Sequence, residues 1–355
     1  MKKIALITHS FHSITQSAPT YINEIFANKE KFKVDIYFNE EWGSQEQYKI
    51  FDHEIEGYDV VIILQLISIS LLNKIKDKNI IFMPMYDYAR NFDIEKWLPA
   101  MGLKILSPCK GMSQTLEKFG LDFQEIKYYP EVDTYTSQDY SKVFFWNRVE
   151  SINYELVLCL LENYQFDNLN IHQTIDPGEH PIVPSSKIIK ENNISFSSWF
   201  DSKNDYLEML SEYGIYIAPR PYEGGGLASF MDALKLGKIV IAPNNSPYAD
   251  YITHNVNGIL YNLNNPEPIN FNEIDLNKMS NNAYESIKSG RKVWTDSLEN
   301  IHKYIFDERI DLINLKFKDL LVQELNNRWY RFGKINNLEK IKAVFRYINK
   351  NLFKV

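Results

Sequence analysis

The sequence is poor in cysteine, in long apolar runs and in positive charge. Its 355 residues include only two cysteines, Cys109 and Cys159, without paired spacing, which excludes a disulfide framework and argues against a zinc site. No stretch approaches the ~18 continuous apolar residues of a membrane-spanning helix. The net charge of −7 argues against a nucleic-acid-binding protein. We therefore expect a cytoplasmic protein that has no nucleic acid partner.

What the first half does contain is a series of continuous apolar runs. Helical stretches such as 70–76 and 111–119 separate these runs. The runs cover residues 4–7, 34–38, 60–66, 80–85, 103–106 and 126–129. Continuous runs indicate strands that are covered on both faces, as in a parallel sheet with helices on each side. Residues 1–138 are thus predicted to form a doubly wound α/β domain.

A polar stretch without apolar periodicity, residues 133–142, is predicted to link this domain to a second one. The second domain, 139–300, is expected to be a Rossmann-like α/β domain too, and residues 301–355 to form C-terminal helices. A helix is predicted over 152–164 and a loop over 175–190. Its strands are expected at 143–146, 169–172, 194–196, 215–218 and 239–242.

Polar side chains follow two strands of the predicted first domain. His9 and Ser10 come after the first strand, and Tyr86 and Asp87 come after the run 80–85. Ligands bind at the carboxyl ends of parallel strands. Asp87 suits a general base or a hydrogen-bond acceptor for a substrate hydroxyl, and the alternative is that it caps a helix or turn. His9 and His12 either contact substrate or have an ordinary loop role, and two histidines without a third ligand predict no metal.

The predicted second domain has an arginine and a tryptophan at strand ends. Arg148 follows the strand 143–146, where a guanidinium can grip a diphosphate bidentately. The alternative is a surface salt bridge of little energetic value. Trp199 follows the strand 194–196 and either stacks on a nucleobase or packs in the core.

The richest stretch of the sequence is 213–262. A strand there ends in Pro219-Arg220-Pro221, and Glu223 and three glycines lead into a helix that Gly237 closes. A strand, a glycine-rich turn and a helix N-terminus together form an anion site. The Glu223 carboxylate can accept hydrogen bonds from hydroxyls. Phosphate and hydroxyl recognition together indicate a nucleotide-sugar, and the alternative is a plain βαβ unit whose glycines allow tight packing.

These motifs together resemble the GT-B-fold glycosyltransferases, specifically the group 1, family 4-like retaining class. Residues 223–227 look like the family's E-G-x-G-L, residues 232–242 like its E-A-x-A-x-G-x-P-V-I-A, and residues 257–260 like its N-G-x-L. Residues 129–133 and 144–148 look like the loop before its linker and its strand ending in a diphosphate-binding basic residue. The resemblance implies two Rossmann-like domains that face each other across a cleft. It also implies transfer of a sugar, with retention, from a nucleotide-diphosphate donor.

The resemblance further assigns roles to the donor side. Glu223 would hold the donor-sugar hydroxyls and favour the developing oxocarbenium ion. Asp232 would accept hydrogen bonds from the ribose, and Arg148 and Arg220 would stabilise the leaving diphosphate. The glycine turn that would face the donor phosphates or sugar consists of Gly224, Gly225, Gly226 and Leu227. No Asp-x-Asp occurs, which agrees with the metal independence usual in this fold, and no cofactor is expected.

On the acceptor side, the resemblance places Asp87 as the second catalytic residue, together with His9, Ser10 and Tyr86. The acceptor is expected to be a glycan or a lipid-linked molecule in surface polysaccharide or glycolipid synthesis. The last helix, 337–355, is amphipathic, and the segment from Lys334 onward has six basic residues and one acid. It would either lie on an anionic membrane, at the inner face, or dock against the protein.

Two other functions stay open, and one departure from the family pattern motivates the second of them, the non-catalytic one. The family places seven residues between its two acids, whereas here Met231 takes the place of the second acid and Asp232 comes one later. The alternatives are a GT-B nucleotide-sugar epimerase and a non-catalytic, degenerate transferase that acts as a binding or assembly subunit.

Overall fold

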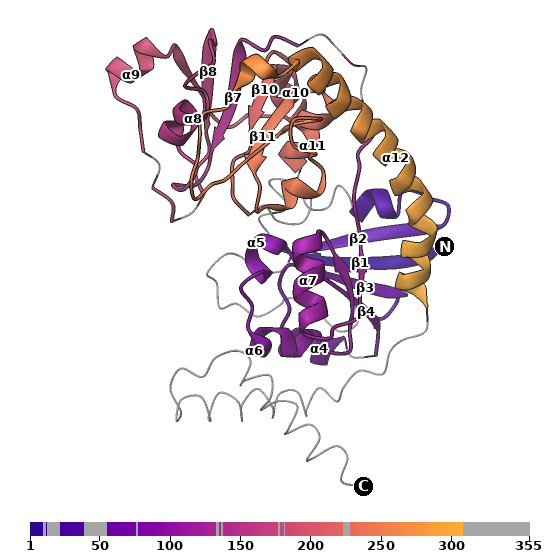
Figure 1. Ribbon diagram of the computed structural model, residues 1–355. Helices are drawn as coiled ribbons and strands as arrows, with labels where there is room; N and C mark the ends of the chain where they lie inside the picture. The colour runs from indigo at the N-terminus through magenta and orange to yellow at the C-terminus, as the bar shows by residue number, and fades with distance from the viewer. Residues whose placement is uncertain are drawn as a thin grey trace, which may run out of the picture. The chain divides into compact units, whose positions relative to one another are not determined.

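A computed structural model shows two compact units. The first contains Met1–Ile126 together with the chain from Leu298, and the second contains Lys127–Ser297. The assignment of an acceptor and a donor domain, with boundaries at 138 and 300, stays a prediction. The described residues are 1–9, 12, 22–38, 55–75, 77–132, 135, 138–176, 178–180, 182–222 and 228–307 (Figure 1). The predicted site residues Ser10 and 223–227 and the predicted helix 337–355 lie outside them.

The first unit is built on a parallel sheet in the order β2-β1-β3-β4-β5-β6. The strands are β1 (Lys2–Thr8), β2 (Phe32–Phe38), β3 (Val60–Leu64), β4 (Asn79–Met83), β5 (Lys104–Ser107) and β6 (Phe123–Glu125). All five residues of β3 are buried, as its continuous apolar run predicts. The strand predicted at 126–129 is wrong, because β6 ends at Glu125. As an edge strand β6 carries Gln124 and Glu125, so it has no apolar run to detect.

Short helices pack the core of the first unit around Trp97. They are α4 (Ile69–Lys74), α5 (Tyr86–Ala89), α6 (Ile94–Trp97), the 3-10 helix η1 (Leu98–Ala100) and α7 (Lys110–Lys118). The Trp97 side chain is fully buried, and its ring lies 6.3 Å from that of Phe82 and 5.2 Å from that of Phe92. Ser68 caps α4 by accepting the Leu71 amide at 3.2 Å, which satisfies one free donor of the first turn.

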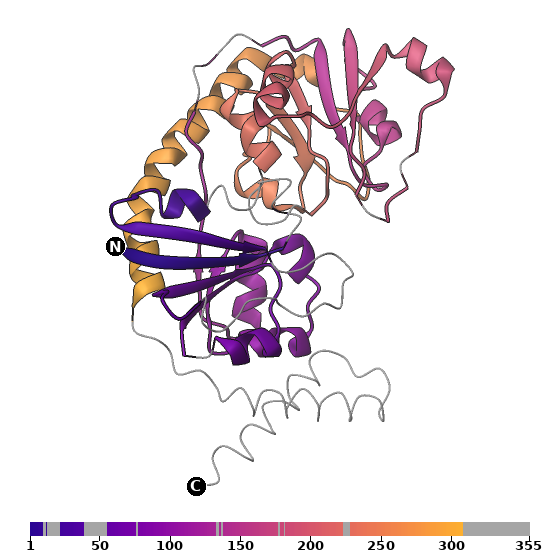
Figure 2. The same ribbon diagram turned by 180° about the vertical axis from the view of Figure 1, so that it is seen from behind.

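The last turns of the long helix α12 (Leu276–Phe306) complete the first unit, beside β1 and β2 (Figure 2). The Phe306 ring stacks on that of Phe32, with centroids 5.8 Å apart. Lys104 Nζ donates to the carbonyls of Tyr304 and Asp307, both at 2.8 Å. A cation at the C-terminus of a helix meets its unsatisfied carbonyls and the negative end of its dipole.

The second unit has its own parallel sheet, in the order β12-β11-β10-β7-β8-β9. The strands are β7 (Lys142–Asn147), β8 (Asn168–Gln173), β9 (Ile194–Ser197), β10 (Ile215–Ile217), β11 (Ile239–Pro243) and β12 (Ile259–Tyr261). Numbered within the unit and read from β9, the order is 3-2-1-4-5-6, that of the dinucleotide-binding Rossmann fold. The predicted α/β class with two doubly wound units is confirmed.

Both faces of the second sheet are covered. Phe145 belongs to a buried cluster on one face and Phe144 to a cluster on the other, because successive side chains of a strand alternate. The covering helices are α8 (Tyr154–Leu160), α9 (Ser186–Glu191), α10 (Lys203–Ser211), α11 (Ala228–Lys235), the first part of α12, and the 3-10 helices η2 (Pro247–Asp250) and η3 (Phe271–Glu273).

Two helix predictions in this unit are corrected. The region 175–190, predicted to be a loop, holds most of α9, whose cap Ser185 accepts the Ile188 amide at 3.4 Å. The nearby prolines conceal this cap in the sequence. The helix predicted over 152–164 is shorter and ends at Leu160, and Asn153 caps its start by accepting the amides of Glu155 and Leu156.

Gly237 closes α11, as predicted. Its φ of 72° lies in the left-handed region that favours glycine. A Cβ atom at this position would lie 2.6 Å from a carbon of the Tyr135 ring, so the close approach also requires glycine. Its carbonyl accepts the Ser280 hydroxyl at 2.6 Å. The end of α11 is thereby joined to both the linker region and α12.

Candidate functional site

The clearest cluster of charge lies at the topological switch point of the second sheet. The chain leaves β7 for β8 on one side and later crosses to β10 on the other side, so the switch point falls between β7 and β10. Arg148 directly follows β7, and Arg220 comes three residues after β10. Ligands of open α/β sheets bind outside the strand ends at this point. The two arginines predicted to bind the donor therefore flank the expected position.

Asp176, which follows the neighbouring strand β8, joins the two arginines. Arg148 Nε and Nη2 donate to Asp176 Oδ1 at 3.0 and 2.7 Å. Arg220 Nη2 forms an ion pair with the other carboxylate oxygen, Oδ2. The side chains are only 16–19% exposed. Arg148 thus forms a salt bridge, as the alternative has it, but a largely buried one, and its contact with a diphosphate stays a prediction. The three groups together carry a net charge of +1.

The loop that carries Asp176 is tied to the end of β7 by further contacts. The Asp176 amide donates to the Arg148 carbonyl at 3.0 Å. Trp146 Nε1 donates to the Thr174 hydroxyl, and the Arg148 guanidinium carbon lies 5.0 Å from the centre of the Trp146 ring. A guanidinium over an indole face gains a cation–π contact. The position of Arg148 is thus set by its backbone, by a ring and by a carboxylate.

His172 lies within the aromatic packing beneath this cluster. Its ring stacks on that of Phe200 at 5.2 Å, and Nδ1 lies 3.0 Å from the Ser197 hydroxyl. Burial, and secondly the charge of Arg148, lower the pKa of His172 from 6.5 to about 4. The ring is therefore neutral at pH 7 and adds no charge to the site.

Asp232, the predicted ribose acceptor, is buried in α11 between two lysines. Its Oδ2 forms an ion pair with Lys203, and its Oδ1 lies 3.9 Å from Lys235 Nζ. Lys203 comes from the first turn of α10, and its Nζ lies 5.1 Å from the centre of the Tyr206 ring. The carboxylate thus faces two lysines, while its contact with ribose stays a prediction.

Trp199 stands at the carboxyl end of β9, and its side chain is 55% exposed. The alternative that it packs in the core is wrong. An exposed indole face at a strand end is available for stacking, which stays a prediction.

In the first unit, His9 and His12 are both buried. Whether they contact substrate or have an ordinary loop role stays open. The His12 Nδ1 shares a hydrogen bond with the Thr8 hydroxyl at the end of β1. Burial, and secondly the neighbouring His9, lower the pKa of His12 from 6.5 to about 4. The ring centroids of the two histidines are 6.4 Å apart.

Tyr86 and Asp87 form the first turn of α5, directly beyond β4. Asp87 Oδ1 accepts the Tyr88 amide at 2.8 Å, although Met85, not Asp87, is the N-cap. The alternative that Asp87 caps a helix or turn is therefore met in part, with Asp87 in the first turn of the helix and not at its cap. An acid in the first turn also meets the positive end of the helix dipole. The Tyr86 hydroxyl packs so close to Gly111 that a Cβ there would approach it to 2.8 Å.

Two residues of interest had not been singled out from the sequence. Asp176 lies in a stretch predicted simply as a loop. It follows β8, and only the strand order shows that β8 lies beside β7. Gln65 directly follows β3, beside the switch point of the first sheet, with a φ of 73° and a buried side chain. A non-glycine residue in this region is uncommon and often marks a functional site.

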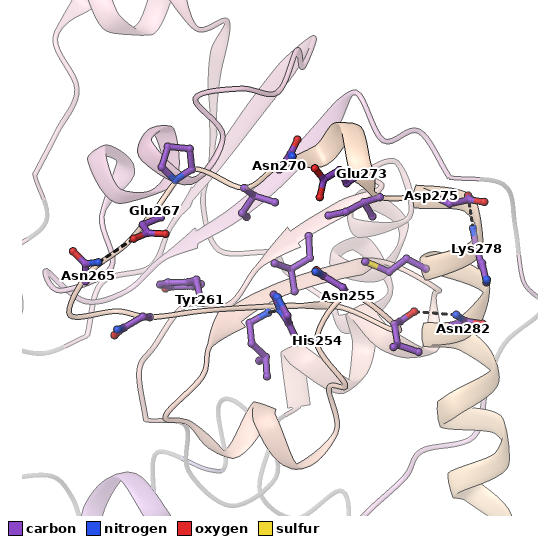
Figure 3. A pocket seen from close by; sticks show the side chains of 18 residues that line it. His254, Asn255, Tyr261, Asn265, Glu267, Asn270, Glu273, Asp275, Lys278 and Asn282 are labelled. Carbon is purple, nitrogen blue, oxygen red and sulfur yellow. Dashed lines mark hydrogen bonds between the residues drawn. The ribbon is translucent and has the colours of Figure 1, made fainter.

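A cavity of about 750 Å³ opens elsewhere on the second unit, between β12 and the start of α12 (Figure 3). None of the predicted site residues within the described ranges lines it. Its polar lining includes His254, Glu267, Glu273, Asp275 and Lys278. This cavity is thus separate from the arginine cluster.

Two features are absent from the part of the chain that the structure describes. No helix there has the length and apolar character needed to cross a membrane. No group of three or more His, Cys, Asp or Glu side chains there is placed to hold a metal ion. Metal independence stays a prediction from the resemblance.

Comparison with known proteins identifies the class. Residues 185–292 match the family model described as Glycosyl transferases group 1. This segment contains Arg220, Glu223 and Asp232, and its match is independent of the strand topology. No curated protein matches the sequence significantly.

Solved structures share the fold over nearly their whole length. A glycosyltransferase from Rickettsia africae ESF-5 is 13% identical with a TM-score of 0.62, covering 86% of this chain and 99% of that one. The apo lipopolysaccharide outer core galactosyltransferase WaaB is 14% identical with a TM-score of 0.53, covering 91% and 99%. Anabaena Alr3699/HepE in complex with UDP and glucose is 13% identical with a TM-score of 0.51, covering 92% and 100%.

The fold is therefore that of the GT-B glycosyltransferases. The second unit carries a segment that matches the group 1 glycosyl transferase model, and through this match the predicted enzyme class, a glycosyltransferase, is confirmed.

Proposed function

We propose that this glycosyltransferase moves a sugar from a nucleoside-diphosphate donor, held by the second unit, to a glycan or lipid-linked acceptor. The observation that carries the proposal is the pair Arg148 and Arg220 at the switch point of a Rossmann-type sheet. Cleavage of a sugar–phosphate bond leaves negative charge on the diphosphate. Two fixed guanidiniums stabilise that charge as it develops, and such preorganised groups are among the largest contributions to catalysis.

The family match supports the remaining donor contacts. Glu223 and the turn Gly224–Leu227 would bind the sugar and phosphates, Asp232 the ribose, and Trp199 the base. The Anabaena protein of the same fold contains UDP and glucose, which supports a nucleotide-sugar as the donor here. Retention of the anomeric configuration and independence of metal are part of the proposal, because they follow from the family resemblance.

The acceptor side is proposed to include His9, Ser10, Tyr86 and Asp87 of the first unit. Burial lowers the pKa of His12 to about 4, so this ring is neutral at pH 7, which supports recognition of neutral hydroxyls. A related fold belongs to a lipopolysaccharide outer core galactosyltransferase, which supports a role in surface polysaccharide or glycolipid synthesis. The basic segment 337–355 would bring the enzyme to the inner face of the membrane.

A thermal-shift screen with sugar nucleotides tests the proposal. A donor at ~100 times its dissociation constant adds ~2.7 kcal/mol to the free energy of unfolding. We expect one nucleoside-diphosphate sugar to raise the melting temperature, and the free sugar and the nucleoside to leave it unchanged. If none of the sugar nucleotides changes it, the alternative of a degenerate, non-catalytic subunit is favoured.

Product analysis of the stabilising donor then separates the two enzymatic functions. A transferase releases the nucleoside diphosphate and needs an acceptor for efficient turnover. An epimerase converts the donor alone into an isomeric sugar nucleotide, and that result would replace the proposed function.

A further inference from the structure

We propose that Asp176 is a positioning residue that holds Arg148 and Arg220 together in the arrangement that grips the donor diphosphate. The inference rests on the proposed function, because it assigns a role within the same donor site. Arg148, Arg220 and Asp176 follow three adjacent strands, β7, β10 and β8. Asp176 therefore lies at the same edge of the sheet as the two arginines.

The first argument concerns electrostatics. Both guanidiniums contact the same carboxylate, one through each oxygen, so their positive charges lie within a few ångströms of each other. Two like charges at this separation repel, and partial burial weakens the screening by water. A carboxylate between them removes the repulsion. Counted by themselves, the two guanidiniums still exceed the one carboxylate, which favours an anion.

The second argument concerns geometry. The Arg148 side chain uses Nε and Nη2 for Asp176, and a guanidinium has five N–H donors. Donors of Arg148 that Asp176 does not use, including both of Nη1, can therefore turn to another anion. A long arginine side chain loses rotamer freedom when it binds a ligand, unless a partner has already fixed it. Asp176 fixes Arg148 before the donor arrives.

The third argument is that Asp176 is itself held in place. Its amide donates to the Arg148 carbonyl, and its carbonyl accepts the Glu179 amide at 3.1 Å. Glu179 in turn accepts the Glu150 amide at 2.8 Å. A loop with this number of backbone contacts supports a side chain that must keep its position.

The direction in which donor binding changes tests the proposal, because an opposite role for Asp176 predicts the opposite change. Asp176 could instead act as an anion that competes with the diphosphate for the two arginines. Removing its charge would then tighten donor binding. If Asp176 positions the arginines, removing its charge weakens binding, although the site becomes more positive by one charge.

The experiment compares wild type with Asp176→Asn and Asp176→Glu. The probes are the nucleoside diphosphates UDP and GDP and inorganic diphosphate, measured by calorimetry on the whole chain. We expect Asp176→Asn to raise the dissociation constant for the bound nucleoside diphosphate by about tenfold or more, because charge-assisted hydrogen bonds are about twice as strong as neutral ones. Asp176→Glu, which keeps the charge, is expected to recover part of the loss.

The matched control is Glu131→Gln, which removes a carboxylate that pairs with Arg291 at 3.2 Å in the same unit. Its dissociation constants should equal those of wild type. Unchanged or tighter binding by Asp176→Asn overturns the positioning role while leaving the proposed function intact. A wild-type chain that binds none of the probes overturns the proposed donor site and, with it, the role of Asp176.

A spectroscopic measurement checks the contact independently of any ligand. The Arg148 Nε–H donates to a partly buried carboxylate at 3.0 Å, so its NMR signal should exchange slowly with water in wild type. In Asp176→Asn we expect this signal to broaden or exchange faster. Equal exchange in the two proteins would mean that Asp176 does not hold the guanidinium, and the inference would be wrong.

Discussion

The strand ends of the two units differ in charge although both sheets are parallel and six-stranded. In the first unit, two buried histidines and a tyrosine stand near the carboxyl ends, and burial keeps His12 neutral. In the second unit, two arginines, a carboxylate and a buried neutral histidine occupy the corresponding place. The sheet determines where a ligand binds. The residues after the strands give the second unit two cations that suit an anion, and the first unit a neutral His12 together with the carboxylate of Asp87.

Two substitutions, one in each unit, test this difference between the strand ends. Glu223→Ala should lower the rate constant of both transfer and donor hydrolysis about 10²–10³-fold, because it removes a preorganised charge from the developing oxocarbenium ion. Asp87→Asn should lower transfer to the acceptor and leave hydrolysis of the donor alone unchanged. Release of the nucleoside diphosphate, with and without acceptor, measures both.

This pair of variants also has clear contrary outcomes. Near-normal transfer by Glu223→Ala would show that the assignment of Glu223 is wrong. A loss of donor hydrolysis in Asp87→Asn would place Asp87 on the donor side and would remove the proposed division of labour between the two units.

A variant that disturbs side-chain packing should have an effect of intermediate size, on the stability of the second unit. Gly290 lies in the α12 part of the second unit, and a Cβ there would lie 2.2 Å from a carbon of the Tyr129 ring. Gly290→Ala should lower the free energy of unfolding by about 1–3 kcal/mol, as overpacking does, in spite of the better helix propensity of alanine. Urea unfolding followed by circular dichroism measures the change.

The control for this variant lies in the other unit. A Cβ at Gly57 would have no neighbour within 4 Å, so Gly57→Ala should stay within about 0.5 kcal/mol of wild type. Equal stabilities of the two alanine variants would show that the ring of Tyr129 yields without cost. Tyr129→Leu combined with Gly290→Ala should recover part of the loss.

The smallest effect concerns the buried histidine of each unit. The folded pKa values of His12 and His172 are about 4, below the value of 6.5 in the unfolded chain. Between these values the unfolded state binds more protons, so the free energy of unfolding falls as the pH decreases below 6.5. Each histidine should contribute a loss of about 1 kcal/mol between pH 7 and pH 5.5.

Urea unfolding at the two pH values checks this prediction. His12→Asn and His172→Asn should each lose less stability on acidification than wild type. The exposed His180 provides the control, because His180→Asn should keep the wild-type dependence. The same dependence in all four proteins would show that neither buried histidine is responsible.

Much of the fold could be predicted because central parallel strands are continuous apolar runs. The run 60–64 is fully buried as β3, and Gly237 marks the end of α11 as its spacing indicates. The edge strand β6 escaped prediction, since an edge carries polar side chains such as Gln124. A local apolar pattern thus indicates that a strand is buried, whereas a strand at the edge of a sheet can exist without such a pattern.

Residues of the candidate site could be predicted only where each one stands in a recognisable local pattern. Arg148 and Arg220 could be proposed singly, each at the end of a strand. Their common partner Asp176 could not, because the contact depends on β8 lying beside β7 and β10 beside β7 on the other side. The positive φ of Gln65 likewise has no sequence signature, since it follows from the tertiary context.

The division of the chain has a consequence for its synthesis on the ribosome. The first unit includes residues from Leu298 onward, and the whole second unit, Lys127–Ser297, is translated before them. At ~5–20 residues per second, these intervening residues take roughly 10–30 s to make. During that interval Phe32 lacks the Phe306 ring that stacks on it and Lys104 lacks its helix carbonyls. The unit that is made first is therefore completed last.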